Sequence, residues 1–249
     1  MLADKRHALI LETVNREGSA TVAGLAESLG ISESTIRRDL LTLDDAGALS
    51  KVHGGAVALD HEGLTRDVPV AERSGQHVAE KRAIAVRAAQ IVGPKDFVYL
   101  DAGSSIDALI DCLTEKHATY ATNCVSHALK LANRGFDVVV LGGSLKNATE
   151  ALVGPDANAA INRYHFTLGF WGTNGATVED GFTTPDLYEA EVKRLSMRQT
   201  IHRFVLADAS KLDRTSLVTF SPLDAATLVT AGLPEDSSWA TRDGVEVVD

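Results

Sequence analysis

The chain has 249 residues, of which 45% are hydrophobic and 5% aromatic, so aliphatic side chains can fill the core of one large domain or two smaller ones. Its formal net charge of -10 argues against a general polyanion binder but leaves room for a local nucleic-acid site. The N-terminal stretch does not resemble a signal peptide, no run approaches the length of a membrane span, and Cys112 and Cys124 form no CxxC motif. We therefore expect a cytoplasmic protein.

The first 58 residues predict three short helices, over 4–16, 22–29 and about 32–46. Thr21 is the expected N-cap of the second helix and Gly30 its stop signal. Short helices joined through a Gly-containing turn are typical of a helix-turn-helix. Residues 1–58 carry six Lys and Arg against eight Asp and Glu. The segment is not basic overall, so the direction in which its arginines point decides what it can bind.

The third predicted helix divides into two faces at about 100° per residue. Its apolar sector holds Ile36, Leu40 and Leu43. The opposite side, near the helix start, carries Ser34, Arg37 and Arg38. A recognition helix needs this division, because one face packs in its own domain while the other offers donors to a major groove. Arginine forms bidentate hydrogen bonds with the edge of a guanine base. The hydroxyls of Ser32 and Ser34 can bind a DNA phosphate at the positive N-terminal end of the helix.

The stretch "LSKVHGGAV" follows and predicts a two-stranded wing that carries Lys51 and His53, with Gly54 and Gly55 in its turn. An alternative fits the same periodicity, namely a three-helix bundle whose paired arginines are merely solvated. Helix-turn-helix geometry is easily imitated, so periodicity alone does not separate the two interpretations.

The exact amino-acid sequence of the segment favours the helix-turn-helix interpretation. "TVAGLAESLGISESTIRRDLLTLDDAGALSKVHGGA" resembles the DNA-binding signature of the DeoR family of bacterial transcription regulators. The resemblance implies that the Ser-x-x-Thr-Ile-Arg-Arg-Asp-Leu run is the recognition helix, which brings Thr35 into the interface. Together with the exposed face of the third helix and the wing, it gives the expected DNA-contacting residues, which are Ser32, Ser34, Thr35, Arg37, Arg38, Lys51 and His53.

Residues 59–77 are polar, contain Pro69 and break the apolar periodicity, which indicates a linker. From 78 to 249, apolar strand-like runs such as "FVYLD", "FDVVVLGG" and "HFTLGFWG" alternate with helix-like runs. This alternation predicts an α/β domain with a largely parallel sheet. The domains are thus expected at 1–58 and 78–249.

Small and polar residues gather where the predicted strands end, and ligands of such sheets bind beyond the carboxyl ends of the strands. "YLDAGSS" puts Asp101, Gly103, Ser104 and Ser105 ahead of a helix, where backbone N–H groups suit a phosphate. Further polar strand ends hold Thr122, Asn123, Gly142 and Gly143. "GTNGATVEDGFTT" predicts a flexible, glycine-marked loop, and Lys193 and Lys211 are candidate partners for an anion. For any single loop of this kind turn geometry is the favoured explanation, but four such loops on one sheet edge favour a ligand site.

The DeoR resemblance continues through "LDAGSS", "TNCVSHALKLA", "VVLGGSL", "EDGFTTPDLYEAEVKR" and "VLADASKLDRTS". It implies a C-terminal domain with the ribose-5-phosphate isomerase fold that senses phosphorylated sugars or related metabolites. The implied effector-binding residues are Asp101, Gly103, Ser104, Ser105, Thr122, Asn123, Gly142, Gly143, Lys193, Asp208 and Lys211. Asn174 stands where the family commonly has Asp, so the chain offers an amide donor where a carboxylate acceptor is usual.

No nucleotide-binding or nucleophile-turn template fits the sequence, and its eight histidines lack metal-ligand spacing, so we expect no cofactor and no metal. Glu189 and Lys193 stand four residues apart, and the spacing fits either a surface ion pair or a pocket role. The sequence therefore predicts a non-enzymatic repressor of carbohydrate-metabolism genes that binds an operator as a homodimer or homotetramer. A sugar-phosphate isomerase with an accessory winged-helix module, and an adaptor that binds proteins through that module, remain alternatives.

Overall fold

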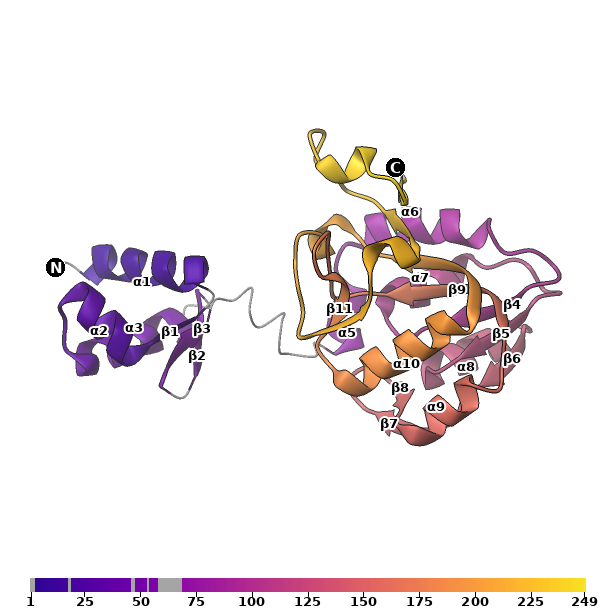
Figure 1. Ribbon diagram of the computed structural model, residues 1–249, viewed down its shortest axis with the longest axis horizontal. Helices are drawn as coiled ribbons and strands as arrows, with labels where there is room; N and C mark the ends of the chain where they lie inside the picture. The colour runs from indigo at the N-terminus through magenta and orange to yellow at the C-terminus, as the bar shows by residue number, and fades with distance from the viewer. Residues whose placement is uncertain (1–2, 18, 46–47, 53, 58–68) are drawn as a thin grey trace. The chain divides into compact units, whose positions relative to one another are not determined.

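The computed structural model describes residues 3–17, 19–45, 48–52, 54–57 and 69–249. The chain divides into two compact units, Met1–Arg66 and Asp67–Asp249, and each is described by itself (Figure 1). Among the residues that the structure describes, no helix combines the length and apolarity needed to span a bilayer.

The first unit packs three helices beside a small antiparallel sheet. The elements are α1 (Ala3–Glu17), β1 (Ser19–Thr21), α2 (Val22–Leu29), α3 (Glu33–Asp45), β2 (Ser50–Val52) and β3 (Gly55–Val57). The core consists of Ile10, Val14, Val22, Leu25, Ile36, Leu40, Leu43, Leu49 and Ala56. The caps of α2 are confirmed: the Thr21 hydroxyl accepts a hydrogen bond from the Gly24 N–H at 3.0 Å, and Gly30 ends the helix with φ of 65°.

The predicted two-stranded wing was wrong in one respect, because the sheet has three strands in the order β1-β3-β2. β1 joins it by pairing with β3 in the register Ala20 with Ala56. Gly55 permits this pairing, since a Cβ atom there would lie 2.3 Å from the Ala20 carbonyl oxygen. The wing is thereby anchored to the segment between α1 and α2, and α3 lies against the same sheet.

The second unit is built on a parallel sheet of seven strands in the order β15-β14-β12-β9-β4-β5-β6. The strands are β4 (Phe97–Leu100), β5 (Thr119–Thr122), β6 (Asp137–Val140), β9 (Phe166–Gly172), β12 (Thr200–Leu206), β14 (Thr227–Thr230) and β15 (Val245–Val247). The predicted alternation of strands and helices is confirmed, although β15 is an addition that the sequence did not indicate.

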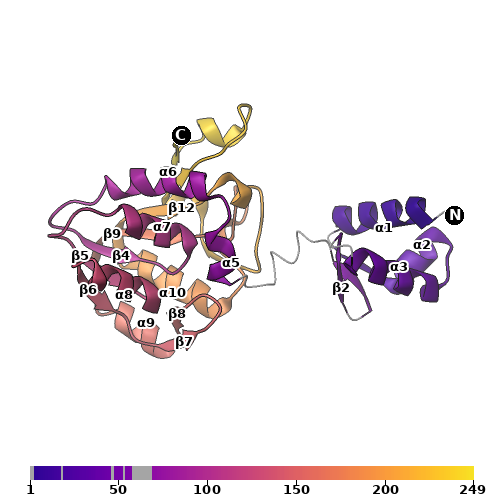
Figure 2. The same ribbon diagram turned by 180° about the vertical axis from the view of Figure 1, so that it is seen from behind.

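Helices cover both faces of this sheet (Figures 1 and 2). The helices are α5 (Val70–Ser74), α6 (Val78–Ala89), α7 (Ser104–Cys112), α8 (Val125–Asn133), α9 (Pro155–Ile161) and α10 (Leu187–Arg198). Residues of α6, α7 and α8 share a core with Val98 and Leu100 of β4, whereas those of α9 and α10 share one with Tyr99. Successive side chains of a strand point to opposite faces, so β4 is buried from both sides.

Two short antiparallel additions complete the second unit. β7 (Ser144–Lys146) pairs with β8 (Ala151–Val153), and β10 (Gly175–Thr177), β11 (Gly181–Thr184) and β13 (Val218–Ser221) form a three-stranded sheet. The flexible loop expected over 172–184 was therefore wrong, because β10 and β11 form a paired hairpin whose Ala176 and Phe182 are buried. The segment 59–77 was expected to be a linker. Within its described residues, 69–77, it contains the helix α5.

Candidate functional site

The exposed side of α3 is the first candidate site. Ile36 and Leu40 are fully buried and Leu43 nearly so, while Ser34, Arg37 and Arg38 are exposed, which confirms the predicted division into two faces. Arg37 forms an ion pair with Glu33 at 2.9 Å. Because both side chains are more than half exposed, breaking this pair costs little free energy. The Arg38 side chain makes no hydrogen bond or ion pair with the described part of the chain.

Three hydroxyl groups gather at the start of the same helix. The Ser32 hydroxyl lies 3.1 Å from that of Ser34 and 3.0 Å from that of Thr35, and the Ser32 carbonyl accepts the N–H of Thr35. Hydroxyls and free N–H groups at a helix N-terminus favour an anion such as a DNA phosphate. The helix thus presents donors for a phosphate and, one turn later, two guanidinium groups.

The wing contributes less to this site within the described residues. Lys51 is exposed on β2, and its backbone N–H donates to the Asp44 carboxylate at 2.9 Å, which ties the wing to α3. His53, the other expected contact on the wing, lies outside the residues that the structure describes.

Sequence reasoning missed the ion cluster that holds α3 in place. Asp39 is only 4% exposed and accepts hydrogen bonds from the Arg6 guanidinium at 2.8 Å and from His7 at 3.0 Å, both on α1. The hydrogen bond from Arg6 is the main cause that lowers the pKa of Asp39 below its ordinary value, and burial opposes it. A signal was present, because Asp39 stands between Ile36 and Leu40 within the apolar stripe of α3.

The second candidate site lies at the switch point of the large sheet. From β4 the chain runs outward through β5 and β6, and it returns to add β9 on the other side of β4. Crevices at such points, beyond the carboxyl ends of the strands, are the usual ligand sites of α/β sheets. A pocket, partly open to solvent, lies here, lined by Ala102–Ser105 after β4 and by Gly172–Asn174 at the end of β9. We call it the switch-point pocket.

One wall of the pocket is the N-terminus of α7. Gly103 precedes the helix with φ of 133°, a left-handed region that favours glycine, and no side chain caps the first turn. Ser104 and Ser105 both line the cavity. Backbone N–H groups and two hydroxyls at a helix start form an anion-binding arrangement.

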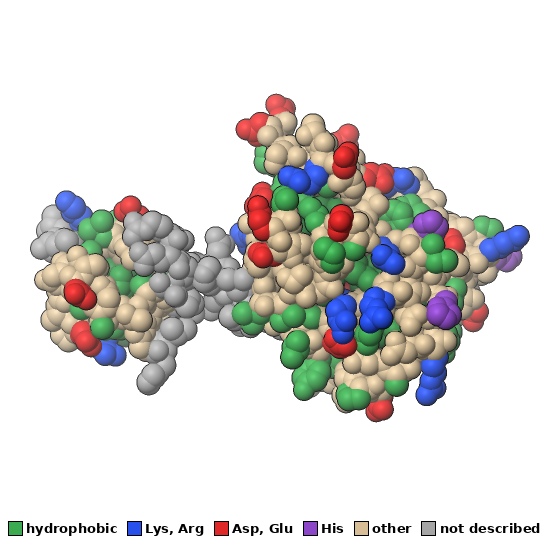
Figure 3. Space-filling view, viewed as in Figure 1, with side chains coloured by type: hydrophobic (Ala, Val, Ile, Leu, Met, Phe, Trp, Pro, Cys, Tyr) green, Lys and Arg blue, Asp and Glu red, His purple; other side chains and the backbone are tan. Residues whose placement is uncertain are grey.

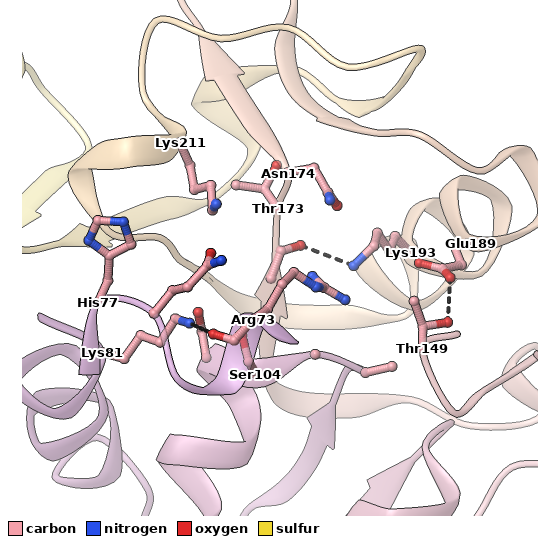
Figure 4. Close-up of a pocket in the computed structure, with 15 residues that line it drawn as sticks. Arg73, His77, Lys81, Ser104, Thr149, Thr173, Asn174, Glu189, Lys193 and Lys211 are labelled. Atoms are coloured by element: carbon pink, nitrogen blue, oxygen red, sulfur yellow. Dashed lines mark hydrogen bonds between the residues drawn. The ribbon is translucent and has the colours of Figure 1, made fainter. Parts of the chain in front are cut away.

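Four cationic side chains reach the pocket from four different elements: Arg73 of α5, Lys81 of α6, Lys193 of α10 and Lys211 of the 3₁₀ turn Ala209–Lys211. Figure 4 shows Arg73 among the other lining side chains. Burial lowers the pKa of both Lys81 and Lys211, and the positive charge of Arg73 lowers it further in each case. Cations that disfavour one another in this way gain most from an anion placed among them.

Lys193 is paired with a carboxylate behind the wall of the pocket. Its ammonium group, 4% exposed, is paired with the buried carboxylate of Asp101 and donates to the Gly172 carbonyl at 3.0 Å. Asp101 does not line the cavity itself but lies directly behind Lys193. The pair therefore fixes the end of β4 against α10.

Glu189 resolves the alternative left open for α10. It is 8% exposed, accepts the Thr149 hydroxyl at 2.6 Å and pairs with Lys146 at 3.0 Å. Glu189 and Lys193 both line the pocket and each has another partner, so their interpretation as a surface ion pair was wrong. The wall formed by Glu189, Thr149 and Asn174 carries acceptors and amide groups suited to hydroxyls rather than to a phosphate.

Besides Asp101, five of the expected effector-binding residues do not line this pocket: Thr122, Asn123, Gly142, Gly143 and Asp208. The first four follow β5 and β6, which lie on the side of β4 away from β9. There they hold loops, as when the Thr122 hydroxyl accepts the Cys124 N–H at 3.1 Å. Asn123 accepts the Tyr99 hydroxyl at 3.1 Å, and a Cβ on Gly143 would lie 2.8 Å from Ala157.

Asp208 is a separate case, because it lies near the cationic wall without lining the cavity. Its carboxylate accepts hydrogen bonds from Ser210, while its other oxygen is buried and has no partner among the described residues. Its negative charge raises the pKa values of Lys81 and Lys211, against the effect of burial. Asp208 therefore balances part of the positive charge from behind.

Charge elsewhere on the molecule is dispersed. On the face of the second unit seen in Figure 3, acidic and basic side chains are interspersed, so that face offers no extended basic surface. Among the described residues, no group of His, Cys, Asp or Glu has the composition to hold a metal ion.

Comparison with known proteins places this geometry in context. A family model described as the DeoR-like helix-turn-helix domain matches residues 6–62, and one described as the DeoR C terminal sensor domain matches residues 76–231. An uncharacterized HTH-type transcriptional regulator FruR of Bacillus subtilis is 37% identical over 236 residues, which cover 94% of this chain and 93% of the relative.

Two further relatives are matched over nearly their whole length. The HTH-type transcriptional regulator GlpR of Haloferax volcanii is 36% identical, with 100% of this chain and 98% of the relative covered. A lactose phosphotransferase system repressor of Staphylococcus aureus is 29% identical, with 96% of each chain covered. Among solved structures, ribose 5-phosphate isomerase A of Neisseria gonorrhoeae aligns with a TM-score of 0.41 and 16% identity over 54% of this chain and 53% of that one. A likeness of that size carries no argument, so the fold description rests on the strand order above.

Proposed function

The chain belongs to the DeoR family, and from this premise we propose that it is a DNA-binding transcription regulator. Its first unit binds an operator in double-stranded DNA, and its second unit binds a phosphorylated sugar or related metabolite that changes operator affinity. We infer that it represses carbohydrate-metabolism genes, in keeping with the relative named as a lactose phosphotransferase system repressor. It acts without a cofactor and without turning its ligand over.

The observation that carries the DNA-binding proposal is the division of α3. Its buried face holds Ile36 and Leu40, while Arg37 and Arg38 are exposed and a hydroxyl cluster stands at the helix start. Residues 1–58 have an excess of two acidic groups over basic ones, so one unit alone has little electrostatic attraction to DNA. We infer that the protein acts as a homodimer or homotetramer, in which two recognition helices enter successive major grooves.

The switch-point pocket supports the effector proposal. Arg73, Lys81 and Lys211 face the uncapped start of α7, so a phosphate bound there meets three cations and the helix N-terminus together. The hydroxyls of the same ligand then lie toward Thr149, Asn174 and Glu189, which offer amide and carboxylate partners. A phosphate at one end and hydroxyls at the other describe a sugar phosphate.

Operator binding by the double variant Arg37→Ala/Arg38→Ala tests the DNA-binding proposal. Gel shifts or fluorescence anisotropy with the protein's own upstream DNA should show at least a tenfold loss of affinity. The slope of log K against log salt should fall by about 1 for each arginine that contacts a phosphate.

The matched control is Arg82→Ala/Arg198→Ala, which removes the same charge from exposed positions of the second unit. This control should bind the operator as the unchanged protein does. Undiminished operator binding by the Arg37/Arg38 variant would show that α3 is not the recognition helix. Turnover of pentose or hexose phosphates by the purified protein would favour an enzyme instead.

A further inference from the structure

A side chain from the segment between the two matched family regions reaches the switch-point pocket. The helix-turn-helix match ends at residue 62 and the sensor-domain match begins at residue 76, yet Arg73 of α5 lines the cavity. In Figure 4 its side chain lies among Ser104, Thr173 and Lys193. The part of the chain that leads toward the DNA-binding unit therefore contributes to the wall of the ligand site.

The attachments of α5 also end on that wall. The Val70 N–H donates to the Ala148 carbonyl at 3.0 Å, next to Thr149, which lines the pocket and bonds to Glu189. The Lys81 ammonium group donates to the Arg73 carbonyl at 2.5 Å. The position of α5 thus depends on two parts of the wall, the Thr149 loop and Lys81, which a ligand in the cavity would contact.

The charges at this wall make the attachment sensitive to an anion. Arg73 lowers the pKa of Lys81 and that of Lys211, so the three cations disfavour one another when the cavity holds no anion. An anion among them converts this repulsion into attraction for each partner. The guanidinium of Arg73 is then drawn toward the α7 N-terminus, and α5 is held more firmly with it.

Resting on the effector site proposed above, we propose that Arg73 contacts the anionic end of the effector and that this contact fixes α5 to the second unit. In the chain, α5 stands between β3, the last described strand of the first unit, and α6, which begins at Val78. The effector thereby changes how firmly the segment that leads toward the DNA-binding unit is held.

The coupling needs only a difference in effector affinity between the two states of α5. A factor of about 5–150 is typical of coupled sites, and the same factor appears in DNA binding because the coupling is reciprocal. A purely structural role for Arg73 predicts no change in α5 when an anion binds.

Hydrogen–deuterium exchange on the full-length protein tests the proposal, with inorganic phosphate as the probe and sodium chloride at matched ionic strength as the reference. Amides of 103–106 report binding at the start of α7, and amides of 70–77 report α5. In the unchanged protein, phosphate should slow exchange in both segments. Arg73→Gln should weaken the phosphate dependence at 103–106 about tenfold and abolish the response of 70–77.

Two further variants control this experiment. Arg82→Gln, an exposed neighbour of Lys81 on α6, should respond as the unchanged protein does, and Arg73→Lys should recover part of both responses because it restores the charge. Exchange in α6 without phosphate should be equal in all variants, which shows that the unit stays folded.

The outcomes separate this inference from the function it rests on. If phosphate slows exchange at 103–106 but leaves 70–77 unchanged, or if Arg73→Gln keeps the full response, the role of α5 is overturned while the effector site stands. If phosphate slows exchange in neither segment, the anion site itself is overturned and this inference falls with it.

Discussion

Asp39 and Lys81 are charged residues that stand within the buried stripes of two amphipathic helices. Asp39 lies between Ile36 and Leu40, and Lys81 lies three residues before Ile84, yet both charged side chains are about 5% exposed. A buried charge is retained where hydrogen bonds or opposite charges compensate for its lost hydration. Asp39 has Arg6 and His7 for that purpose, whereas Lys81 has, within the part of the chain that the structure describes, the Arg73 carbonyl and the more distant charges of Asp208 and Glu80. The first residue is a structural anchor, and the second is a candidate ligand contact.

Replacing Asp39 by Asn should destabilise the first unit, because the neutral amide cannot match the charge-assisted hydrogen bond from Arg6. Such bonds contribute about 1.5–3 kcal/mol, and the partial exposure of Arg6 (13%) and His7 (22%) favours the lower end. Amide exchange in α3 of the full-length protein should become about tenfold faster at pH 7. The exposed change Glu27→Gln serves as the control and should leave the exchange unchanged.

The loss of stability caused by Asp39→Asn should depend on pH. The pKa of Asp39 is lower in the folded protein than its ordinary value, so its stabilisation is present above about pH 3.9 and is lost as the pH falls toward the lowered value. The difference between the unchanged protein and Asp39→Asn should therefore shrink below about pH 4. A difference that persists undiminished at pH 2 would contradict the role of the carboxylate charge.

At the scale of elements, the wing and the pocket each depend on one glycine, Gly55 through a close backbone approach and Gly103 through its positive φ. β1 pairs with β3 because Gly55 leaves room for the Ala20 carbonyl, and this pairing connects the wing to the loop before α2. In the second unit, Gly103 gives the turn that aims the start of α7 at the cavity. Each glycine acts on function through the position of a neighbouring helix.

Gly55→Ala should weaken both the wing and operator binding. The added methyl group would lie 2.3 Å from the Ala20 oxygen, so β1 and β3 must separate, at a cost of about 1–3 kcal/mol. Faster amide exchange in 19–21 and 55–57 would reveal the separation, and gel shifts would measure the loss of affinity. Gly142→Ala, where a Cβ meets nothing within 4 Å, should change neither. Normal exchange across 19–21 in Gly55→Ala would contradict this account of the three-stranded wing.

At the scale of the whole molecule, the negative net charge favours DNA binding by two or more copies of the chain together. The chain carries -10 formal charges, and its DNA-binding segment contributes no net positive charge to offset them. Affinity must then come from a few well-placed contacts repeated on two half-sites rather than from a general basic surface.

Half-site spacing tests this cooperation. Once the operator is located, inserting about 5 base pairs between its half-sites should turn them to opposite sides of the duplex and weaken binding at least tenfold. Inserting about 10 base pairs should restore part of the affinity, because the half-sites face the same side again. Equal affinity for all three spacings would mean that each DNA-binding unit acts alone.

The sequence by itself determined the local features of this protein. The caps of α2, the two faces of α3 and the alternation of strands and helices each depend on residues a few positions apart, so composition and periodicity were sufficient to predict them. The DeoR resemblance was carried by contiguous motifs for the same reason.

Only the tertiary structure decided which strand ends meet. Thr122 and Gly142 follow strands just as Ser104 does, but the order of the sheet puts β9, not β5 or β6, beside β4 at the switch point. The pocket is therefore completed by Arg73 and Lys81 of the consecutive helices α5 and α6 and by Glu189 of α10, which lies far from them in the sequence. Strand order depends on long-range packing, and no spacing within a short segment encodes it.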